Sequence, residues 1–194
     1  MKRFRTPKGA FFLFLAAACV FLAYYLINLR IEKSKPEDYV TLTPVQEVLS
    51  RDLQRNYPQT PKEVLKYYSE ITRCFYNEEY TEEELEALAM KAVEMYDSEL
   101  AANKDKETYL QDLKKEILLF KEKDWHISSY ATSASTDVFY FTEDGYEFAR
   151  LYCTYNIRNG TVMQMLEERF LLRMDKQGHW KIYGWEAVEN NEQK

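Results

Sequence analysis

An uninterrupted apolar run near the amino terminus constrains this chain more than any other feature of its sequence. The residues from Ala10 to Ile27 carry no charge, and as a helix they would extend over about 27 Å. That length nearly crosses the hydrocarbon core of a bilayer, so we predict a transmembrane helix over residues 10–29. Residues 1–9 form a basic tail before it. Residues 30–42 lack an apolar period and are interpreted as a short stalk.

The charges around this run predict its orientation. Four basic residues and no acidic one precede it, and positive charge stays on the cytoplasmic side. We therefore expect a cell-membrane protein with its amino terminus in the cytoplasm and everything beyond about Arg30 outside. A cleavage site at Ala16–Ala18 or a lipoprotein signal ending at Ala18–Cys19 would use the same residues. Both require the apolar run to stop there, but it continues to Ile27, so an uncleaved anchor is preferred.

The rest of the chain is acidic. Of the 26 basic and 32 acidic residues, seven basic and one acidic lie within Met1–Lys35. The part beyond Lys35 therefore carries 19 basic and 31 acidic residues, a net charge of −12. Such a domain would repel a polyphosphate, so nucleic acid is not expected as a partner. The length suits one domain with a sizeable core, which we assign to residues 43–188, followed by a polar tail at 189–194.

Capping boxes predict three helix starts. In each, a threonine accepts a hydrogen bond from a first-turn amide, and a Glu or Gln three residues later reaches back to the threonine amide. Apolar residues at spacings of three and four continue the third of these helices to Leu100. After a break at residues 103–105, another amphipathic helix runs to about Phe120. The three capping threonines are Thr43, Thr60 and Thr81.

After Trp125 the period of the apolar residues changes to two, which indicates strands. Phe148–Arg158 alternates cleanly, Asn159–Gly160 favours a two-residue hairpin turn, and the following strand reaches Met174. Three further strands are predicted at Ile127–Ser133, Asp137–Phe141 and Trp180–Ala187. Helices followed by antiparallel strands predict an α+β fold.

The order of these elements resembles a known fold. Helices, then long strands, then Gly-His-Trp-Lys-Ile-Tyr-Gly-Trp at Gly178–Trp185 are similar to nuclear transport factor 2-like domains. The resemblance implies three to four helices packed on a curved antiparallel sheet, which together form a cone with a pocket. It also implies a small strand between the second and third helices, for which Ala101–Glu107 is too polar and short. More narrowly, Leu42–Trp185 resembles an uncharacterised family of membrane-anchored bacterial domains.

Metal and cofactor sites are not predicted. His126 and His179 are the two histidines, and neither has a Cys or His partner three or four residues away. The acidic run Glu78–Glu86 overlaps a helix start, where the helix dipole stabilises carboxylates, so a solvated cap is preferred over a cation site. Phosphate loops and nucleophile elbows are absent. Asn159–Thr161 matches a glycosylation acceptor, but the hairpin turn explains it.

Two cysteines, Cys74 and Cys153, lie in the predicted outer domain. A disulfide between them is allowed outside the cytoplasm. Sequence does not establish that their Cα atoms approach closely enough, so two buried thiols are the preferred interpretation.

Glu168 is the candidate for acid–base chemistry. Strict alternation along Val162–Met174 places it on the apolar face, and in a poorly hydrated pocket its pKa would rise and it could carry a proton. Pocket enzymes of the resembled fold use an acidic base in such a place, and Tyr155 could donate a hydrogen bond nearby. The preferred alternative is a bulge at Glu167–Glu168, which would turn both acids to water.

No complete catalytic set emerges from the sequence. The first hypothesis is therefore a single-pass protein whose extracytoplasmic domain binds a protein or envelope partner without catalysis. The alternative is a small-molecule-binding or acid/base pocket that uses Glu168 and Tyr155 inside the cone. A third hypothesis is contact through the outward sheet face, where Phe148, Arg150 and Tyr152 lie. An open or a filled cone interior would distinguish the first two.

Overall fold

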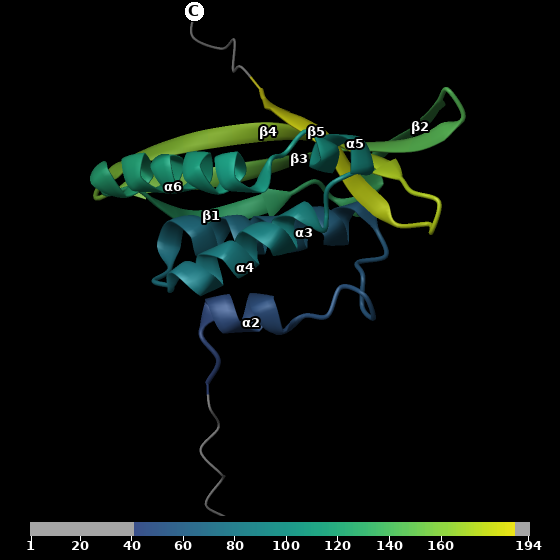
Figure 1. Ribbon diagram of the computed structural model, residues 1–194. Helices are drawn as coiled ribbons and strands as arrows, with labels where there is room; N and C mark the ends of the chain where they lie inside the picture. Colours follow the sequence, from purple (N-terminus) through teal and green to yellow (C-terminus); the bar gives the residue numbers. More distant parts are fainter. Residues whose placement is uncertain (1–40, 189–194) are drawn as a thin grey trace, which may run out of the picture. The chain divides into compact units, whose positions relative to one another are not determined.

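The computed structural model describes residues 41–188 (Figure 1). The chain divides into two units, Met1–Thr41 and Leu42–Lys194, and the second is the folded domain considered below. The predicted membrane helix and basic tail, nearly all of the stalk and the polar tail lie outside the described residues. Within residues 41–188, no helix is both long and apolar enough to span a bilayer.

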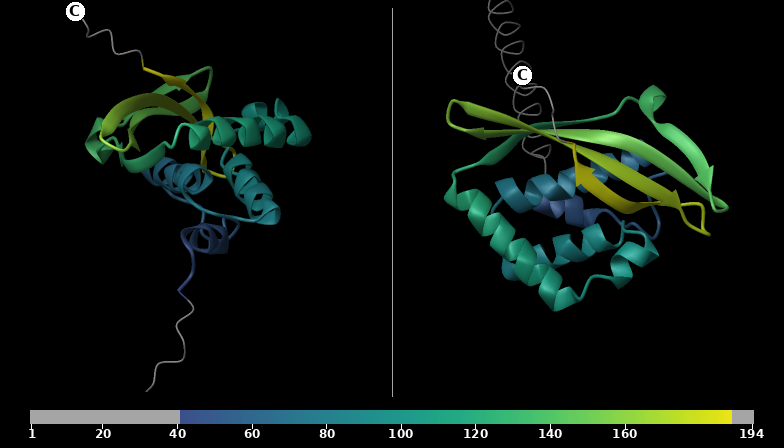
Figure 2. Two further views of the ribbon diagram at one scale, coloured as in Figure 1. Left: turned by 90° about the vertical axis from the view of Figure 1, so that its left-hand side faces the viewer. Right: turned by 90° about the horizontal axis from the view of Figure 1, so that it is seen from above.

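The described residues form helices followed by an antiparallel sheet, which confirms the predicted α+β class. The helices are α2 (Pro44–Ser50), α3 (Pro61–Asn77), α4 (Glu82–Val93), α5 (Ser98–Ala102), α6 (Lys106–Glu122) and the short η1 (Ser135–Asp137). The strands are β1 (His126–Thr132), β2 (Phe139–Glu143), β3 (Tyr146–Asn159), β4 (Val162–Met174) and β5 (Trp180–Ala187). Figure 2 shows the sheet curving over the helices, an arrangement compatible with a nuclear transport factor 2-like fold.

All three predicted capping boxes are present. Thr43, Thr60 and Thr81 precede α2, α3 and α4, and each hydroxyl accepts from the amide three residues on. The Gln or Glu at that third position accepts in turn from the threonine amide. Each such cap stabilises its helix by about 1 kcal/mol. The starts of these helices are therefore specified locally.

The third of these helices is shorter than predicted. It ends at Val93 rather than Leu100, because the chain leaves the helix to pair with β5. The Ile182 amide donates to the Met95 carbonyl at 2.9 Å, and the Asp97 amide donates to the Ile182 carbonyl at 2.8 Å. This isolated parallel bridge lies before Ala101–Glu107, the segment considered for the small strand that the resemblance implies. The predicted break at 103–105 is confirmed, since it separates α5 from α6.

The sheet has the order β1-β3-β4-β5, with β2 pairing the start of β3 on the same edge as β1. Residues of β3 face alternately inward and outward as predicted, with Ala149, Leu151 and Cys153 fully buried. The β3–β4 turn differs from the prediction by one residue. Asn159 pairs with Val162, so the two loop residues are 160 and 161, and only Gly160 has a positive φ, +54°. This geometry suits a turn with glycine first.

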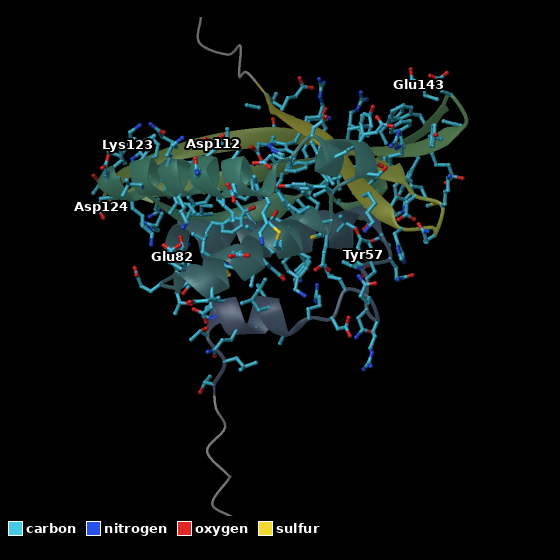
Figure 3. The ribbon with its side chains drawn as sticks, in the orientation of Figure 1. Tyr57, Glu82, Asp112, Lys123, Asp124 and Glu143 are labelled. Carbon is cyan, nitrogen blue, oxygen red and sulfur yellow. The ribbon has the colours of Figure 1, made fainter. Side chains whose placement is uncertain are left out.

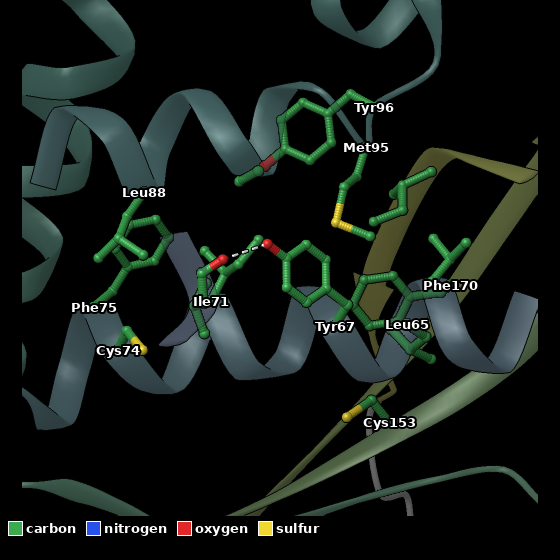
Figure 4. Packing of buried hydrophobic residues seen from close by; sticks show 14 of the residues in the cluster. Leu65, Tyr67, Ile71, Cys74, Phe75, Leu88, Met95, Tyr96, Cys153 and Phe170 are labelled. Carbon is green, nitrogen blue, oxygen red and sulfur yellow. Dashed lines mark hydrogen bonds between the residues drawn. The ribbon is translucent and has the colours of Figure 1, made fainter. Parts of the chain in front are cut away.

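The helix α3 lies at the centre of the hydrophobic core. It packs against α2, α4, β1, β3 and β5, and Figure 4 shows Leu65 of α3 beside Phe170 of β4. The Tyr67 hydroxyl is satisfied by the Val48 carbonyl at 2.7 Å, drawn as a dashed line in Figure 4. A large polar-tipped ring can therefore be buried here without an unpaired hydroxyl.

The outer face of the sheet is less open than predicted. Phe148 points outward but is only 8% exposed. Its ring stacks on Phe141 with centroids 5.3 Å apart and meets the edge of Tyr183 at 5.7 Å. The guanidinium of Arg150 lies over the Phe139 ring at 4.8 Å. Aromatic side chains of β2 and β5 thus occupy part of the face that the third hypothesis assigned to a partner.

Candidate functional site

A cavity of about 630 Å³ opens between α6 and the sheet. Its walls come from α3, the α4–α5 and α5–α6 connections, α6, β1, β3, β4 and β5. Seen from above in Figure 2, α6 runs along the side of the sheet bordered by β4 and β5. The side chains of this region are drawn in Figure 3, where Asp112 is labelled on α6. Aromatic side chains are the most frequent kind in the lining. They are Tyr68, Phe75, Tyr76, Tyr96, Tyr109, Phe120, Trp125, Tyr155 and Trp185.

The weak packing of α6 accounts for this space. Along α6 only Leu113 and Ile117 are buried, and the helix packs mainly on α3. Leu118 and Leu119 are exposed to 59% and 58%. One narrow apolar stripe can bind a helix to a single neighbour. The sheet side of α6 is therefore free to border a cavity.

Ion pairs and terminal contacts hold α6 in place. The predicted acidic cap of α4 is present, and Figure 3 shows Glu82 at the start of this helix. Carboxylates of α4 also form ion pairs with lysines of α6. The pairs are Glu82 with Lys114 and Glu86 with Lys106. At the end of α6, the Asn159 side chain donates to the Lys123 carbonyl at 2.6 Å. Exposed ion pairs stabilise by at most about 1 kcal/mol each, so they position α6 more than they stabilise the fold.

Glu168 lies on the wall of this cavity. Pairing of β3 with β4 is continuous through Thr154 and Glu167 and through Cys153 and Glu168. The preferred prediction of a bulge at Glu167–Glu168 is therefore wrong, because every residue of β3 from Phe148 to Asn159 has a partner in β4. Strict alternation then turns Glu168 to the same face as the apolar residues.

The environment of Glu168 favours its protonated form. Burial, followed by the negative charge of Glu116 on α6, raises the pKa of Glu168 from 4.5 to about 7. Within the described residues, neither a hydrogen bond nor an ion pair engages its carboxyl group. Near neutral pH this carboxyl can accept or release a proton, and it can bind a polar atom that enters the cavity.

Tyr155 lines the same cavity but is engaged elsewhere. Its hydroxyl lies 3.0 Å from Ser69 Oγ of α3, and no hydrogen bond joins it to Glu168 in the described part of the chain. Burial raises its pKa far above 10. Ser69 also donates to the Leu65 carbonyl at 2.9 Å. This arrangement makes Tyr155 a fixed part of the wall, neutral at physiological pH.

Both described cysteines are free thiols. Cys74 and Cys153 are buried, which confirms the preferred interpretation over a disulfide. Burial raises the pKa of Cys74 to about 11. Thiols of this kind stay protonated and behave as small apolar side chains.

Trp185 is one of the wall residues that the sequence pattern does not predict. Simple alternation along β5 would place Trp185 on the face of the sheet opposite to that of Ile182. However, β5 has a bulge, because Tyr183 is an extra residue between the pairs Leu171–Gly184 and Leu172–Ile182. This bulge returns Trp185 to the inner face, where it stacks on Phe170 with ring centroids 6.0 Å apart. A glycine inside a strand is the usual sign of a bulge, and Gly184 was the available signal.

The histidines take structural positions. His126 is exposed at the start of β1, and His179 stacks on Tyr57 with centroids 4.5 Å apart. Across residues 41–188, no group of three or more His, Cys, Asp or Glu side chains converges as metal ligands would.

A second charged cluster lies outside the cavity. The Arg173 guanidinium, buried on β4, is held by Asp97 and donates to Glu99 at 2.9 Å. Rings of Tyr146 and Tyr183 lie 4.8 and 4.7 Å from it. Because these partners satisfy the arginine, the cluster ties the α4–α5 connection to the sheet.

Comparisons with known proteins add a family but no activity. No curated protein matches the chain. A family model described as "Domain of unknown function (DUF6715)" matches residues 1–185. Since this match covers nearly the whole sequence, the chain belongs to the DUF6715 family of domains of unknown function.

Proposed function

We propose that the outer domain binds a small molecule in the cavity between α6 and the sheet. The observation that carries this proposal is the open volume of about 630 Å³ beside the carboxyl of Glu168, which has no partner among the described residues. Ligand pockets are typically concave, mainly apolar and of several hundred Å³, with few polar groups that orient the ligand. A cavity with these properties favours the pocket hypothesis over a domain that only docks to a partner.

Binding can be tested on the fragment 41–194, because Leu42–Lys194 is a compact unit and its described part has its own hydrophobic core. A thermal-shift screen of small molecules is expected to give ligands that raise the melting temperature. The variant Leu166→Trp would replace an isobutyl group at the cavity wall by a larger indole ring and should abolish the shift.

A matched pair of variants tests the polar group. Glu168→Gln should weaken the hits that raise the melting temperature, whereas Glu167→Gln, on the opposite face of β4, should leave them unchanged. A screen without ligands that respond to Leu166→Trp contradicts the proposal.

We further propose that residues 10–29 anchor this domain to the cell membrane, with the domain outside the cytoplasm. The charge-free run Ala10–Ile27 and the basic residues before it support this topology. Protease added to intact spheroplasts should remove the domain and spare a cytoplasmic marker. Survival of both would contradict the topology.

A protein partner is the second candidate function, supported by an unpaired stretch of β4. β5 pairs only with residues 168–174 of β4, so residues 162–166 lack a strand on that edge within the described part of the chain. Four apolar residues are exposed on this stretch: Val162, Met163, Met165 and Leu166. Open strand edges are sites where an extended segment of a partner can add to a sheet.

Site-specific crosslinking tests this partner surface. A photoreactive residue at Met163 should give one defined adduct in intact cells, and the adduct should disappear when Met165→Lys is added. The same residue at Glu143, in the distant β2–β3 hairpin, is the control. Equal adducts from both positions would contradict a partner at β4.

A further inference from the structure

The wall of the α6 cavity carries an excess of negative charge. Among the residues that the structure describes, its ionisable side chains, tyrosines aside, are four carboxyl groups and one amine. The amine belongs to Lys104, in the connection between α5 and α6. The carboxyl groups are those of Asp105, Asp112, Glu116 and Glu168.

Within residues 41–188, three of the four carboxylates have hydrogen-bond or ion-pair partners, and Glu168 is the exception. Asp105 caps α6 and accepts from the Thr108 amide at 3.0 Å. The other two pairs are Asp112 with Lys115 at 3.1 Å and Glu116 with the Tyr76 hydroxyl at 2.7 Å. Glu168 is therefore the carboxyl group that a ligand can engage without displacing a partner.

The aromatic part of the wall already accommodates a cation. The Lys104 ammonium lies 5.2 Å from the centre of the Tyr109 ring and 6.0 Å from that of Trp185. These are distances at which the face of an aromatic ring attracts positive charge. Tyr68 and Tyr96 continue the aromatic surface beside Trp185, with centroids 5.9 and 5.7 Å from it.

We propose that the ligand of this cavity is an organic cation, an amine or quaternary ammonium with an apolar body, whose charge is balanced by Glu168. This inference rests on the proposed function of the cavity and specifies its ligand class. Rings and a carboxylate together attract an ammonium group. An anionic ligand would instead meet four carboxyl groups against one lysine, which makes its binding unfavourable.

The charge state of Glu168 links this binding to pH. A permanently charged cation binds the ionised carboxylate, so its affinity must rise with pH through the pKa of Glu168, about 7. The ionisable groups that surround Glu168 are carboxyl, phenol and thiol groups, apart from the Lys104 amine. They are Glu116 and Asp112 of α6, Tyr68 and Tyr76 of α3, and Tyr155 and Cys153 of β3.

Two probes of the same shape test the ligand class on the fragment 41–194, without lipid into which an apolar probe would partition. Benzyltrimethylammonium carries a permanent charge, and neopentylbenzene is its uncharged carbon isostere. Calorimetry and ligand-observed NMR should show that the cation binds more tightly. Its affinity should rise roughly tenfold from about pH 5.5 to about pH 8.5, whereas the isostere should show no such rise.

Variants assign the effect to named groups. Glu168→Gln should lower cation affinity by about tenfold at high pH and abolish its pH dependence. Glu167→Gln, on the outer face of the same strand, is the matched control and should leave both unchanged. Lys104→Met should strengthen cation binding, because it removes the positive charge beside Tyr109 and Trp185.

The outcomes separate this inference from the function on which it rests. Preferential binding of the isostere, or cation binding that falls as pH rises, overturns the ligand class but leaves a small-molecule cavity. Binding of neither probe up to its solubility limit also overturns the ligand class, and the independent thermal-shift screen then decides the cavity function. Cation binding that survives Glu168→Gln unchanged overturns the role of Glu168.

Discussion

The two sides of the helix layer differ in what lies between helix and sheet. At α3, side chains such as Leu65 are fully buried in the hydrophobic core. At α6, two apolar residues are buried, Leu113 and Ile117, and a cavity of about 630 Å³ lies between the helix and β4. One side therefore supplies the stability that allows the other to remain open. We expect variants of the two sides to separate stability from binding.

The largest effect is expected at the filled side. Leu65→Ala should lower the free energy of unfolding by about 2–5 kcal/mol, because Leu65 is 0% exposed and its removal leaves a cavity in the core. Leu119→Ala on α6 is the control, with an expected change within about 0.5 kcal/mol. Chemical denaturation measures both. Equal losses would refute the assignment of stability to the α3 side.

Glu168→Gln, on the α6 side, should raise the free energy of unfolding at high pH. The pKa of Glu168 is raised from 4.5 to about 7 in the folded state, so the folded state binds the proton more tightly. The free energy of unfolding must then fall as pH rises from about 4.5 to about 7. Glutamine removes this penalty, so the variant should be more stable than the wild type by roughly 1–3 kcal/mol above about pH 7.5 and similar near pH 4.

Denaturation curves across this pH range provide the measurement. Glu167→Gln should reproduce the wild-type pH dependence, because that side chain faces away from the cavity. A Glu168→Gln curve that runs parallel to the wild type would mean that Glu168 is hydrated in the folded state.

The N-terminal caps of α3 and α6 allow the two sides of the helix layer to be compared through the same kind of substitution. Thr60 caps α3, and Thr60→Ala should cost about 1 kcal/mol of global stability. Asp105 caps α6, and hydrogen bonds from Thr108 lower its pKa. Asp105→Ala should lower the melting temperature less than Thr60→Ala. It should nevertheless speed amide exchange in the first turn of α6, which hydrogen-exchange mass spectrometry can resolve.

The smallest effect is expected from the ion pairs that position α6. Lys114→Gln removes the pair with Glu82, and its cost should be within about 1 kcal/mol. High salt should reduce the difference from the wild type further. A loss comparable to that of Leu65→Ala would show that α6 contributes to the stability of the whole domain.

Local signals in the sequence predict most of this fold. The capping boxes at Thr43, Thr60 and Thr81 fix helix starts because both partners lie within one turn. Alternation predicts the inner face of β3, and the same rule places Glu168 inward on β4. These features depend on residues that are close in the sequence, so they can be predicted without a structure.

Features that depend on distant pairing are not predicted. α4 ends at Val93 because Tyr96 bridges to Ile182, and nothing near Val93 signals that partner. The bulge at Tyr183 that turns Trp185 inward depends on the register with β4. The volume of the cavity depends on how far α6 lies from the sheet, which no local pattern encodes. The membrane anchor remains a prediction, since it lies outside the described residues.

Contacts at both ends of α6 limit how the cavity can open. Its beginning follows α5, which Arg173 ties to the sheet through Glu99, and its end is held by the side chain of Asn159. A helix held at both ends can bend outward in its middle but cannot rotate about one end. We therefore expect the gap beside β4 to widen most at mid-helix and very little at the termini. Slender molecules that slide in lengthwise should exchange faster than rounded ones of equal size.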